Sequence, residues 1–225
     1  MPGRLERKVV TLLAAEDPDK LHDALSQAGF RRSQDLAYRP ACDDCSACVP
    51  VRVPVAEFTP GRTQRRILQE NQGMIYRAIP ALATREHYFL FRRYILARHG
   101  DGGMADMDFG DYRAMIEDSP VSTHLAEFRD VEGQLVGVCL TDRMGDGLSL
   151  VYSFFDPILA DRSPGTAMIL RQIEAARELD LPFVYMGYWI AESRKMAYKR
   201  KFRPLEALTH EGWQRLPDQA TDTTS

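Results

Sequence analysis

Three cysteines lie three residues apart in the stretch 38–53 (YRPACDDCSACVPVRV), at Cys42, Cys45 and Cys48. Crowded cysteines in a reducing compartment are more often metal ligands or reactive groups than disulfide partners. A tetrahedral zinc site needs four ligands, and only three are local, because Cys139 is expected to be a small core residue. The spacing leaves three interpretations open: an iron–sulfur cluster, a zinc ion, or three partly buried thiols that stabilise a turn.

Basic side chains gather in two other segments, PGRTQRR (60–66) and ESRKMAYKRKF (192–202). The net charge of −3 argues against a protein that coats nucleic acid indiscriminately, but a local positive face still binds phosphate groups. A solvated helix face is the alternative interpretation. The candidate phosphate contacts are Arg62, Arg65, Arg66, Lys199 and Lys201.

Composition bounds the class of protein. Apolar residues make up 44% of the 225 residues and charged residues 27%, which is ordinary for a globular chain with a core. No apolar run approaches the roughly 18–20 residues of a membrane helix. The opening MPGRLERKVV lacks the apolar segment of a secretory signal. We therefore expect a cytoplasmic protein with no membrane partner.

The elements that position these residues follow from periodicity and turn signals. In the first half they are a strand over 9–14, a helix over 21–30, a strand over 49–58, helices over 63–77 and 85–98, and a Gly- and Asp-rich loop over 99–112. The strand over 49–58 carries Pro50 and Pro54, which cannot donate ladder hydrogen bonds, so we expect it at a sheet edge.

The second half has a different pattern. It predicts strands over 124–130, 134–143 and 148–156, a loop and long helix over 161–181, a strand over 182–190, a basic helix over 192–202 and a last strand near 205–210. This order is typical of the GNAT-like acyltransferase fold, in the α+β class, with a mixed, largely antiparallel sheet flanked by helices.

One local motif supports that fold. Residues 162–167 (RSPGTA) match R-x-x-G-x-A, the loop that opens onto a helix in acetyl-CoA-dependent members. Free N–H groups at a helix start bind phosphate oxygens. A tight turn before a helix is the equally weighted alternative.

Five segments in series carry a wider resemblance. They are YRPACDDCSACVPVRV, FTPGRTQRRILQEN, GLSLVYSFFDP, RSPGTAMILRQI and GYWIAESRKMAYKRKFRPLE. Together they closely resemble the bacterial aspartate/glutamate leucyltransferases, relatives of the eukaryotic arginyl-tRNA–protein transferases. The resemblance implies transfer of leucine from leucyl-tRNA to proteins with N-terminal Asp or Glu, which marks them for degradation through an N-degron route. The implied partners are aminoacyl-tRNA and the acceptor protein, and not DNA.

One departure from that family concerns the N-terminus. Members carry a segment resembling C-P-Y-L-P-G-R before the first strand, whereas this sequence starts Met1-Pro2-Gly3-Arg4. We expect a start codon that has been placed too late. The missing cysteine is then a candidate fourth ligand beside Cys42, Cys45 and Cys48. The eukaryotic relatives are linked to iron–sulfur clusters, and a cluster, a zinc ion and three metal-free thiols all stay open for this sequence.

The resemblance also implies roles for single residues. An aminoacyl ester is already activated and a free α-amine has a pKa of about 7.7–8.0, so positioning supplies most of the rate. The candidates for hydrogen-bonding or general-base work are Tyr152, Ser153 and Asp156.

Substrate binding needs a cation for the acceptor carboxylate and an aromatic surface for the unpaired end of the tRNA. Arg162 and Lys195 are preferred over Arg129 as carboxylate ligands, and Tyr188 and Trp189 are the stacking candidates. Core packing is the alternative for Trp189.

These segments divide the chain into a cysteine-bearing part (1–75), a transferase domain (76–217) and a disordered tail (218–225). Two rival functions stay open. One is an acetyl-CoA-dependent GNAT N-acetyltransferase, which rests on the R-x-x-G-x-A match. The other is a non-catalytic RNA-binding or iron–sulfur sensor protein, which would use the same basic residues and cysteines.

Overall fold

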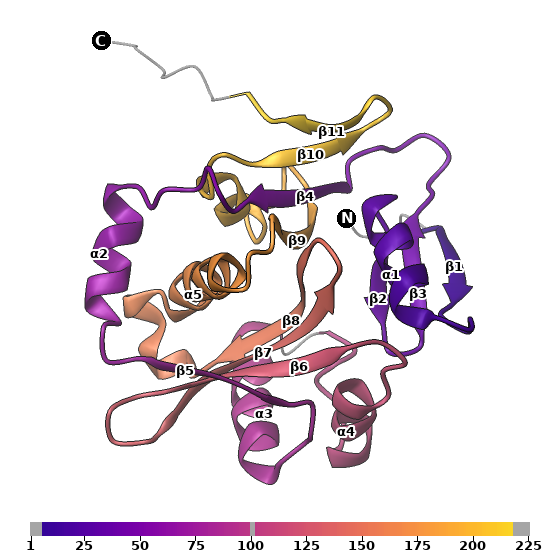
Figure 1. Cartoon of the computed structure of the whole chain (residues 1–225). Coiled ribbons are helices and arrows are strands. Elements are labelled where there is room, and N and C mark those ends of the chain that lie inside the picture. Colours follow the sequence, from indigo (N-terminus) through magenta and orange to yellow (C-terminus); the bar gives the residue numbers. More distant parts are fainter. Residues whose placement is uncertain (1–5, 100–101, 218–225) are drawn as a thin grey trace.

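The computed structural model describes residues 6–99 and 102–217, which form two β-sheets with helices packed around them (Figure 1). The elements, in chain order, are β1 (Lys8–Leu12), α1 (Pro18–Gln27), β2 (Arg31–Ser33), β3 (Leu36–Pro40), β4 (Val49–Pro54), α2 (Arg62–Glu70), β5 (Ile75–Pro80), α3 (Arg85–His99), α4 (Phe109–Glu117), β6 (Thr123–Arg129), β7 (Leu135–Met144), β8 (Gly147–Phe155), the 3-10 helix η1 (Pro157–Arg162), α5 (Pro164–Glu178), β9 (Phe183–Trp189), the 3-10 helix η2 (Ala197–Lys201), β10 (Glu206–Thr209) and β11 (Gly212–Arg215).

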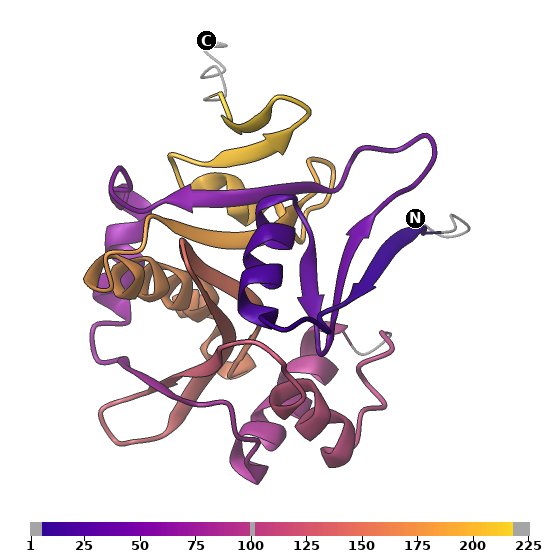
Figure 2. The same cartoon turned by 45° about the vertical axis from the view of Figure 1, so that its right-hand side comes forward.

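The large sheet has eight strands in the order β11-β10-β4-β9-β8-β7-β6-β5. Its neighbours pair antiparallel, except that β8 and β9 are parallel and are joined by the crossover helix α5. The small sheet has the order β1-β3-β2 and lies with α1 at one side of the large sheet (Figure 2). The predicted α+β class with a mixed, largely antiparallel sheet is therefore confirmed, as is the order β6-β7-β8-α5-β9.

Helices cover both faces of the middle of the large sheet. Successive side chains of a strand point to opposite faces, so Leu125 lies in a cluster with Phe91 of α3, while Ala126 lies in a cluster with Met168 of α5. The strand β7 is buried along almost its whole length, as expected for a strand covered on both sides. Among the described residues, no helix combines the length and apolar character that crossing a membrane requires.

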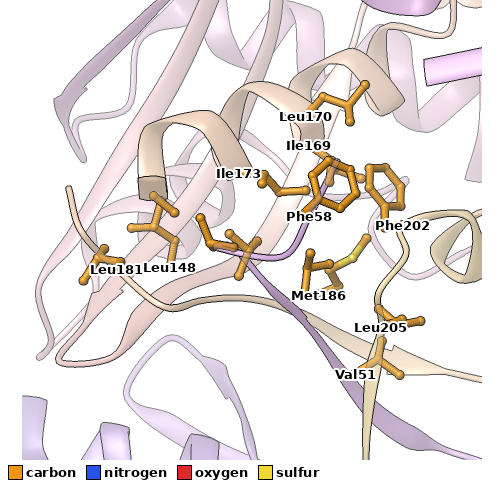
Figure 3. Packing of buried hydrophobic residues seen from close by; sticks show 14 of the residues in the cluster. Val51, Phe58, Leu148, Ile169, Leu170, Ile173, Leu181, Met186, Phe202 and Leu205 are labelled. Carbon is orange, nitrogen blue, oxygen red and sulfur yellow. The ribbon is translucent and has the colours of Figure 1, made fainter. Parts of the chain in front are cut away.

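The helix α5 contributes to the largest of the buried hydrophobic clusters among the described residues (Figure 3). Ile169 and Ile173, one helical turn apart, pack in a cluster with Phe58, Met186 and Phe202 from segments far apart in the chain. Burial of each such side chain contributes about 1.5–3 kcal/mol to stability. The cluster therefore joins the segment between β4 and α2, the strand β9 and the segment after β9 to one helix.

The expectation that 49–58 forms an edge strand is wrong. The strand β4 lies between β10 and β9. It pairs with β10 only at Val51 and Arg52, whereas Pro50 and Pro54 lie on either side of that short stretch. The prolines are tolerated because the positions paired on both sides still have N–H groups. β4 thus joins the segment 1–75 to the sheet built from later residues, and the division at residue 75 stays a prediction.

The predicted helix over 63–77 and the loop over 99–112 are each only partly right. The first helix ends at Glu70, where Asn71 Nδ2 donates to the carbonyl of Ile67, and β5 follows as the outer strand beside β6. The loop contains the start of α4, where the amides of Asp108 and Asp111 each donate to the other residue's carboxylate. The polar residues of the first segment did not indicate the strand β5, which is paired on one side only. Those of the second segment did not indicate the capping box at the start of α4.

The predicted helix over 192–202 is also wrong, because the segment is a series of turns that ends in the short η2. The predicted strand near 205–210 is confirmed as β10, and β11, which forms a hairpin with it, was not foreseen. The residues Met1–Arg4 and the tail 218–225 lie outside the described residues.

A buried ionic cluster attaches the small sheet to the large one. The guanidinium of Arg32 on β2 donates to both carboxylate oxygens of Asp142 on β7, at 2.7 Å each. Thr123 Oγ1 donates to the same carboxylate at 2.8 Å, and His22 Nε2 of α1 lies 3.2 Å from it. Burial raises the pKa of Asp142, but Arg32 and His22 outweigh this effect and the pKa is lowered. The cluster is therefore a charged anchor inside the protein.

We predict that Asp142→Asn lowers the free energy of unfolding by about 3–5 kcal/mol, because it leaves the charge of Arg32 buried without its partner. Urea denaturation followed by circular dichroism measures the change. Asp35→Asn, which alters an exposed carboxylate on the turn between β2 and β3, is the control and should change stability little.

The same cluster has a pH dependence with a definite sign. Because the pKa of the Asp142 carboxylate is lowered in the folded state, the carboxylate stabilises the fold at pH values above the ordinary pKa of Asp. This stabilisation is lost as the pH falls through the folded-state pKa. The Asn variant should lack that part of the acid sensitivity. A loss below about 1 kcal/mol for Asp142→Asn, or an unchanged acid profile, would show that apolar contacts hold the small sheet instead.

Candidate active site

The strands β8 and β9 separate where a bulge bends β8. Leu140 of β7 pairs with Tyr152 and Thr141 with Leu150, so Val151 is an extra residue in β8. A bulge bends its strand and leaves one residue unpaired. β8 pairs with β9 only at its start, from Gly147 to Ser149. We call the gap beyond Ser149 the strand wedge.

Two cations fill the strand wedge. Arg31 of β2 donates from Nη2 to the carbonyls of Leu150 and Val151, both at 2.8 Å, and from Nη1 to the carbonyl of Met186 at 3.3 Å. The Lys199 ammonium donates to the carbonyls of Met186 and Tyr188. The unpaired carbonyls of both strands thus gain donors, which buried backbone groups require.

The packing around Arg31 requires a glycine. At Gly187 an added Cβ would lie 1.1 Å from Arg31 Nη1, and the backbone there has a φ of +75°. Lys199 is also tightly placed, with 7% of its surface exposed. Burial, together with the nearby charge of Arg31, lowers the pKa of Lys199 to about 7. Its amine is therefore charged for only part of the time at neutral pH.

A cavity of about 520 Å³ lies beside the end of β8. We call it the central pocket. It is lined by Tyr94, Ala97, Arg98, Phe155, Ala160, Ser163, Gly165, Thr166, Ile169, Lys195 and Tyr198. These residues come from α3, from the continuous stretch formed by the end of β8, η1 and the first turns of α5, and from the segment after β9, so three separate parts of the chain form its walls.

The central pocket combines an apolar wall with two cations. Tyr94 meets the Phe155 ring edge-on, with ring centroids 5.0 Å apart, and the guanidinium of Arg98 lies 5.5 Å from the same ring. Lys195 is exposed at the pocket. Burial raises the pKa of Tyr94, so its hydroxyl stays protonated at neutral pH. Such a pocket accepts an apolar side chain next to an anion.

The predicted catalytic residues lie near the pocket but not in its lining. Tyr152 packs against Phe91, with ring centroids 6.3 Å apart, and burial raises its pKa. Ser153 pairs with Cys139 on β7. Asp156 caps η1 through Oδ1 and bonds Arg93 through Oδ2 at 2.7 Å. Both oxygens of Asp156 therefore have partners within the fold, and the catalytic role of these residues stays a prediction.

Of the two preferred carboxylate ligands, Lys195 lines the central pocket, whereas Arg162 is exposed at the end of η1. The R-x-x-G-x-A loop lines part of the pocket, but most of its backbone N–H groups already donate hydrogen bonds within the protein. The Ser163 N–H donates to Ala160, the N–H groups of Thr166 and Ala167 donate to Ser163, and Pro164 has none. At most one amide, that of Gly165, is left for a phosphate.

The aromatic candidates take different positions. Tyr188 is buried, and its hydroxyl lies 2.9 Å from the Gly29 carbonyl and 3.0 Å from the Tyr38 carbonyl, so it holds the small sheet against β9. Trp189 is half-buried and lines a second cavity with Arg200 and Lys201. It is thus next to cations, as a stacking residue for nucleic acid would be.

The basic candidates separate into exposed and buried residues. Arg62, Arg65 and Arg66 are exposed on α2, where Arg66 lies 3.5 Å from Glu70. Lys201 is exposed on η2. Lys199 was expected on an exposed helix face, but it is buried, because its amine donates hydrogen bonds in the strand wedge.

Sequence reasoning missed Arg31 in the wedge and Tyr94 and Arg98 in the pocket. Tyr94 and Arg98 lie four residues apart on the predicted helix over 85–98, a spacing that places them on one face. That spacing was the available signal for them. No local pattern distinguishes Arg31 from the neighbouring Arg32.

The three cysteines stay separate thiols. The N–H of Cys45 donates to the carbonyl of Cys42 at 3.5 Å, in a turn. Burial, with the other cysteines nearby, raises the pKa of Cys48. Among the described residues no three His, Cys, Asp or Glu side chains are placed to hold a metal ion, and the metal-binding role of these cysteines stays a prediction. Cys139 is buried in the core, as expected.

Comparison with known proteins gives consistent matches. The family model described as arginine-tRNA-protein transferase, N terminus, matches residues 1–66, and the model for the C terminus matches residues 86–209. The aspartate/glutamate leucyltransferase of Paramagnetospirillum magneticum is 57% identical over 95% of this chain and 88% of the relative. That of Parvibaculum lavamentivorans is 58% identical over 96% of this chain and 89% of the relative.

Solved structures show the same fold at low identity. FemX aligns with a TM-score of 0.52 and 10% identity over 88% of this chain and 68% of its own. L-PGS from Bacillus licheniformis aligns with a TM-score of 0.52 and 15% identity over 66% of this chain and 47% of its own. The chain has the GNAT-like acyltransferase fold that the order of its elements predicts. On its sequence matches, it belongs to the arginine-tRNA-protein transferase family, as an aminoacyltransferase of the aspartate/glutamate leucyltransferase group.

Proposed function

We propose that the protein transfers leucine from leucyl-tRNA to the N-terminal Asp or Glu of acceptor proteins, which marks them for degradation in the cytoplasm. The observation that carries the proposal is the similarity to two aspartate/glutamate leucyltransferases, at 57% and 58% identity over nearly the whole chain. The central pocket supports it, because the reaction needs an apolar surface and a cation side by side.

The pocket supplies both. Tyr94, Phe155 and Ile169 form an apolar wall that receives the leucyl side chain. Arg98 and Lys195 bind the acidic side chain of the acceptor, since charge-assisted hydrogen bonds to a carboxylate are stronger than neutral ones. Specificity for Asp and Glu then arises from these two cations.

The chemistry requires placement more than activation. The ester is reactive, and a free α-amine with a pKa of about 7.7–8.0 is partly neutral at pH 7. Holding the amine against the ester carbonyl therefore supplies most of the rate. Tyr152, Ser153 and Asp156 remain candidates for the proton transfers, beside the pocket and not in its wall.

The tRNA body is proposed to lie across α2 and η2. Gln64 Nε2 of α2 donates to the carbonyl of Lys201 at 3.1 Å, so the two elements are in contact. Arg62, Arg65, Arg66 and Lys201 then form one basic surface for phosphate groups. Lys199 is omitted from this surface because its amine is buried.

Acetyl transfer is the less supported reaction. A pyrophosphate needs several free amides at the helix start, and at most one remains between Ser163 and Ala167. The strand wedge beside the pocket is also already filled by Arg31 and Lys199.

The donor is tested in one assay with the purified full chain. Radiolabelled leucyl-tRNA, arginyl-tRNA and acetyl-CoA are each supplied with peptides that begin with Asp, Glu, Lys or Ala. We predict transfer from leucyl-tRNA to the Asp and Glu peptides only. Transfer from arginyl-tRNA would contradict the proposed donor, and acetylation would contradict the reaction class. Binding of tRNA without any transfer would identify a binding protein instead.

The acceptor site is tested by Arg98→Ala and Lys195→Ala. Each should lower kcat/KM for Asp and Glu peptides roughly ten- to a hundredfold, because a hydrogen bond to a charged group is lost. Arg113→Ala, which removes an exposed cation on α4, is the matched control. Leucyl-tRNA affinity should stay unchanged in all three variants. An equal loss of that affinity would assign the two cations to the tRNA.

A further inference from the structure

A second cavity, of about 500 Å³, lies next to the segment after β9. We call it the tryptophan pocket. It is lined by Trp189, Ala191, Ala197, Arg200, Lys201 and Arg203. It shares no lining residue with the central pocket, although both use the segment between Lys195 and Arg203.

Consecutive residues of η2 point into three different places. Tyr198 lines the central pocket, Lys199 is buried in the strand wedge, and Arg200 and Lys201 line the tryptophan pocket. The central pocket and the tryptophan pocket therefore lie on different sides of one short helical turn.

The tryptophan pocket combines an aromatic ring with positive charge. The guanidinium of Arg200 lies 5.3 Å from the Trp189 ring centroid. Arg200 also donates to the carbonyl of Pro217 at 3.1 Å, and Arg203 donates to the carbonyl of Arg200 at 3.4 Å. The lining residues, all in the described part of the chain, include three cations and no carboxylate. A negative ligand is therefore the complement of this cavity.

Two hydrogen-bond donors at this cavity are unsatisfied. Trp189 Nε1 and Arg200 Nε are buried and have no acceptor among the described residues. Buried donors are usually paired, so a pair without acceptors next to a cavity indicates a ligand that brings acceptors. Because both nitrogen atoms are buried, the side chain of Trp189 or Arg200 must shift slightly before its nitrogen contacts a ligand in the cavity.

We propose that the tryptophan pocket holds an unpaired nucleotide from the single-stranded 3′ end of the RNA donor. The inference rests on the proposed function, which places the aminoacyl group in the central pocket. Bases without partners stack on aromatic rings and on arginine planes, and their phosphates bind exposed cations. Trp189 and Arg200 supply the stacking surface, while Lys201 and Arg203 bind the phosphates.

The test measures binding of a fluorescein-labelled RNA tetranucleotide with the sequence of the tRNA 3′ end to the full chain, by fluorescence anisotropy. Trp189→Leu should weaken binding roughly 5- to 150-fold, the range expected for one stacked base. Trp189→Tyr should restore most of the affinity, because a ring is retained.

A second variant leaves the packing untouched. Lys201 is exposed, so Lys201→Gln should fold normally. It should reduce the slope of log affinity against log salt by about 0.7, as expected when one phosphate contact of a single strand is lost. Arg113→Gln, with the same charge change on α4, should bind as the original chain does.

Two results would overturn the assignment. One is unchanged affinity for the tetranucleotide in both Trp189→Leu and Lys201→Gln. The other is displacement of the tetranucleotide by an oligo-aspartate peptide at equal concentration, which would make the pocket a protein-binding site. Leucyl transfer by the original chain, together with unchanged tetranucleotide binding in both variants, would contradict only the assignment of the tryptophan pocket. The donor assay therefore distinguishes a failure of that assignment from a failure of the proposed function.

Discussion

Two neighbouring arginines on a three-residue strand fix the arrangement on which the rest of this structure depends. Successive residues of a strand point to opposite sides. Arg32 therefore reaches the buried Asp142 on β7, while Arg31 enters the gap between β8 and β9. Ion pairing in the interior is favourable only when geometry and additional hydrogen bonds are good. The bidentate contact and Thr123 meet that condition, so β2 has essentially one position relative to the large sheet.

The strand wedge explains several features that look unrelated. Once the bulge at Val151 separates β8 from β9, their carbonyls lack strand partners, and buried carbonyls need donors. Arg31 and Lys199 provide these donors. Burial, together with the nearby charge of Arg31, lowers the pKa of Lys199, and the position of Arg31 excludes a side chain at Gly187. The same demand prevents a regular helix over 192–202, because η2 must turn Lys199 inward.

The sequence predicts well where the pattern is local. The strands β6 to β9 are apolar runs bounded by turn signals and the helix α5 is amphipathic, and they appear as expected. The strands β5 and β11 show no regular alternation of buried and exposed positions, so only pairing with a neighbour defines them. In the site, Lys195 was expected to flank the cleft and lines the central pocket, while its role as a carboxylate ligand stays a prediction. The burial of Lys199 was not expected, because a run of cations gives no sign of which one the fold buries.

The geometry of η2 places strong limits on any mechanism. Its neighbouring side chains Tyr198, Lys199 and Arg200 lie at the central pocket, in the strand wedge and at the tryptophan pocket, so the position of η2 affects all three. A reaction between two large substrates needs their ends held in a fixed relation, since misplacement of reacting groups reduces the rate steeply. Anchoring η2 to the carbonyls of β9 through Lys199 gives the segment that rigidity. The buried lysine therefore serves as a fixed support for η2, which lies between the central pocket and the tryptophan pocket.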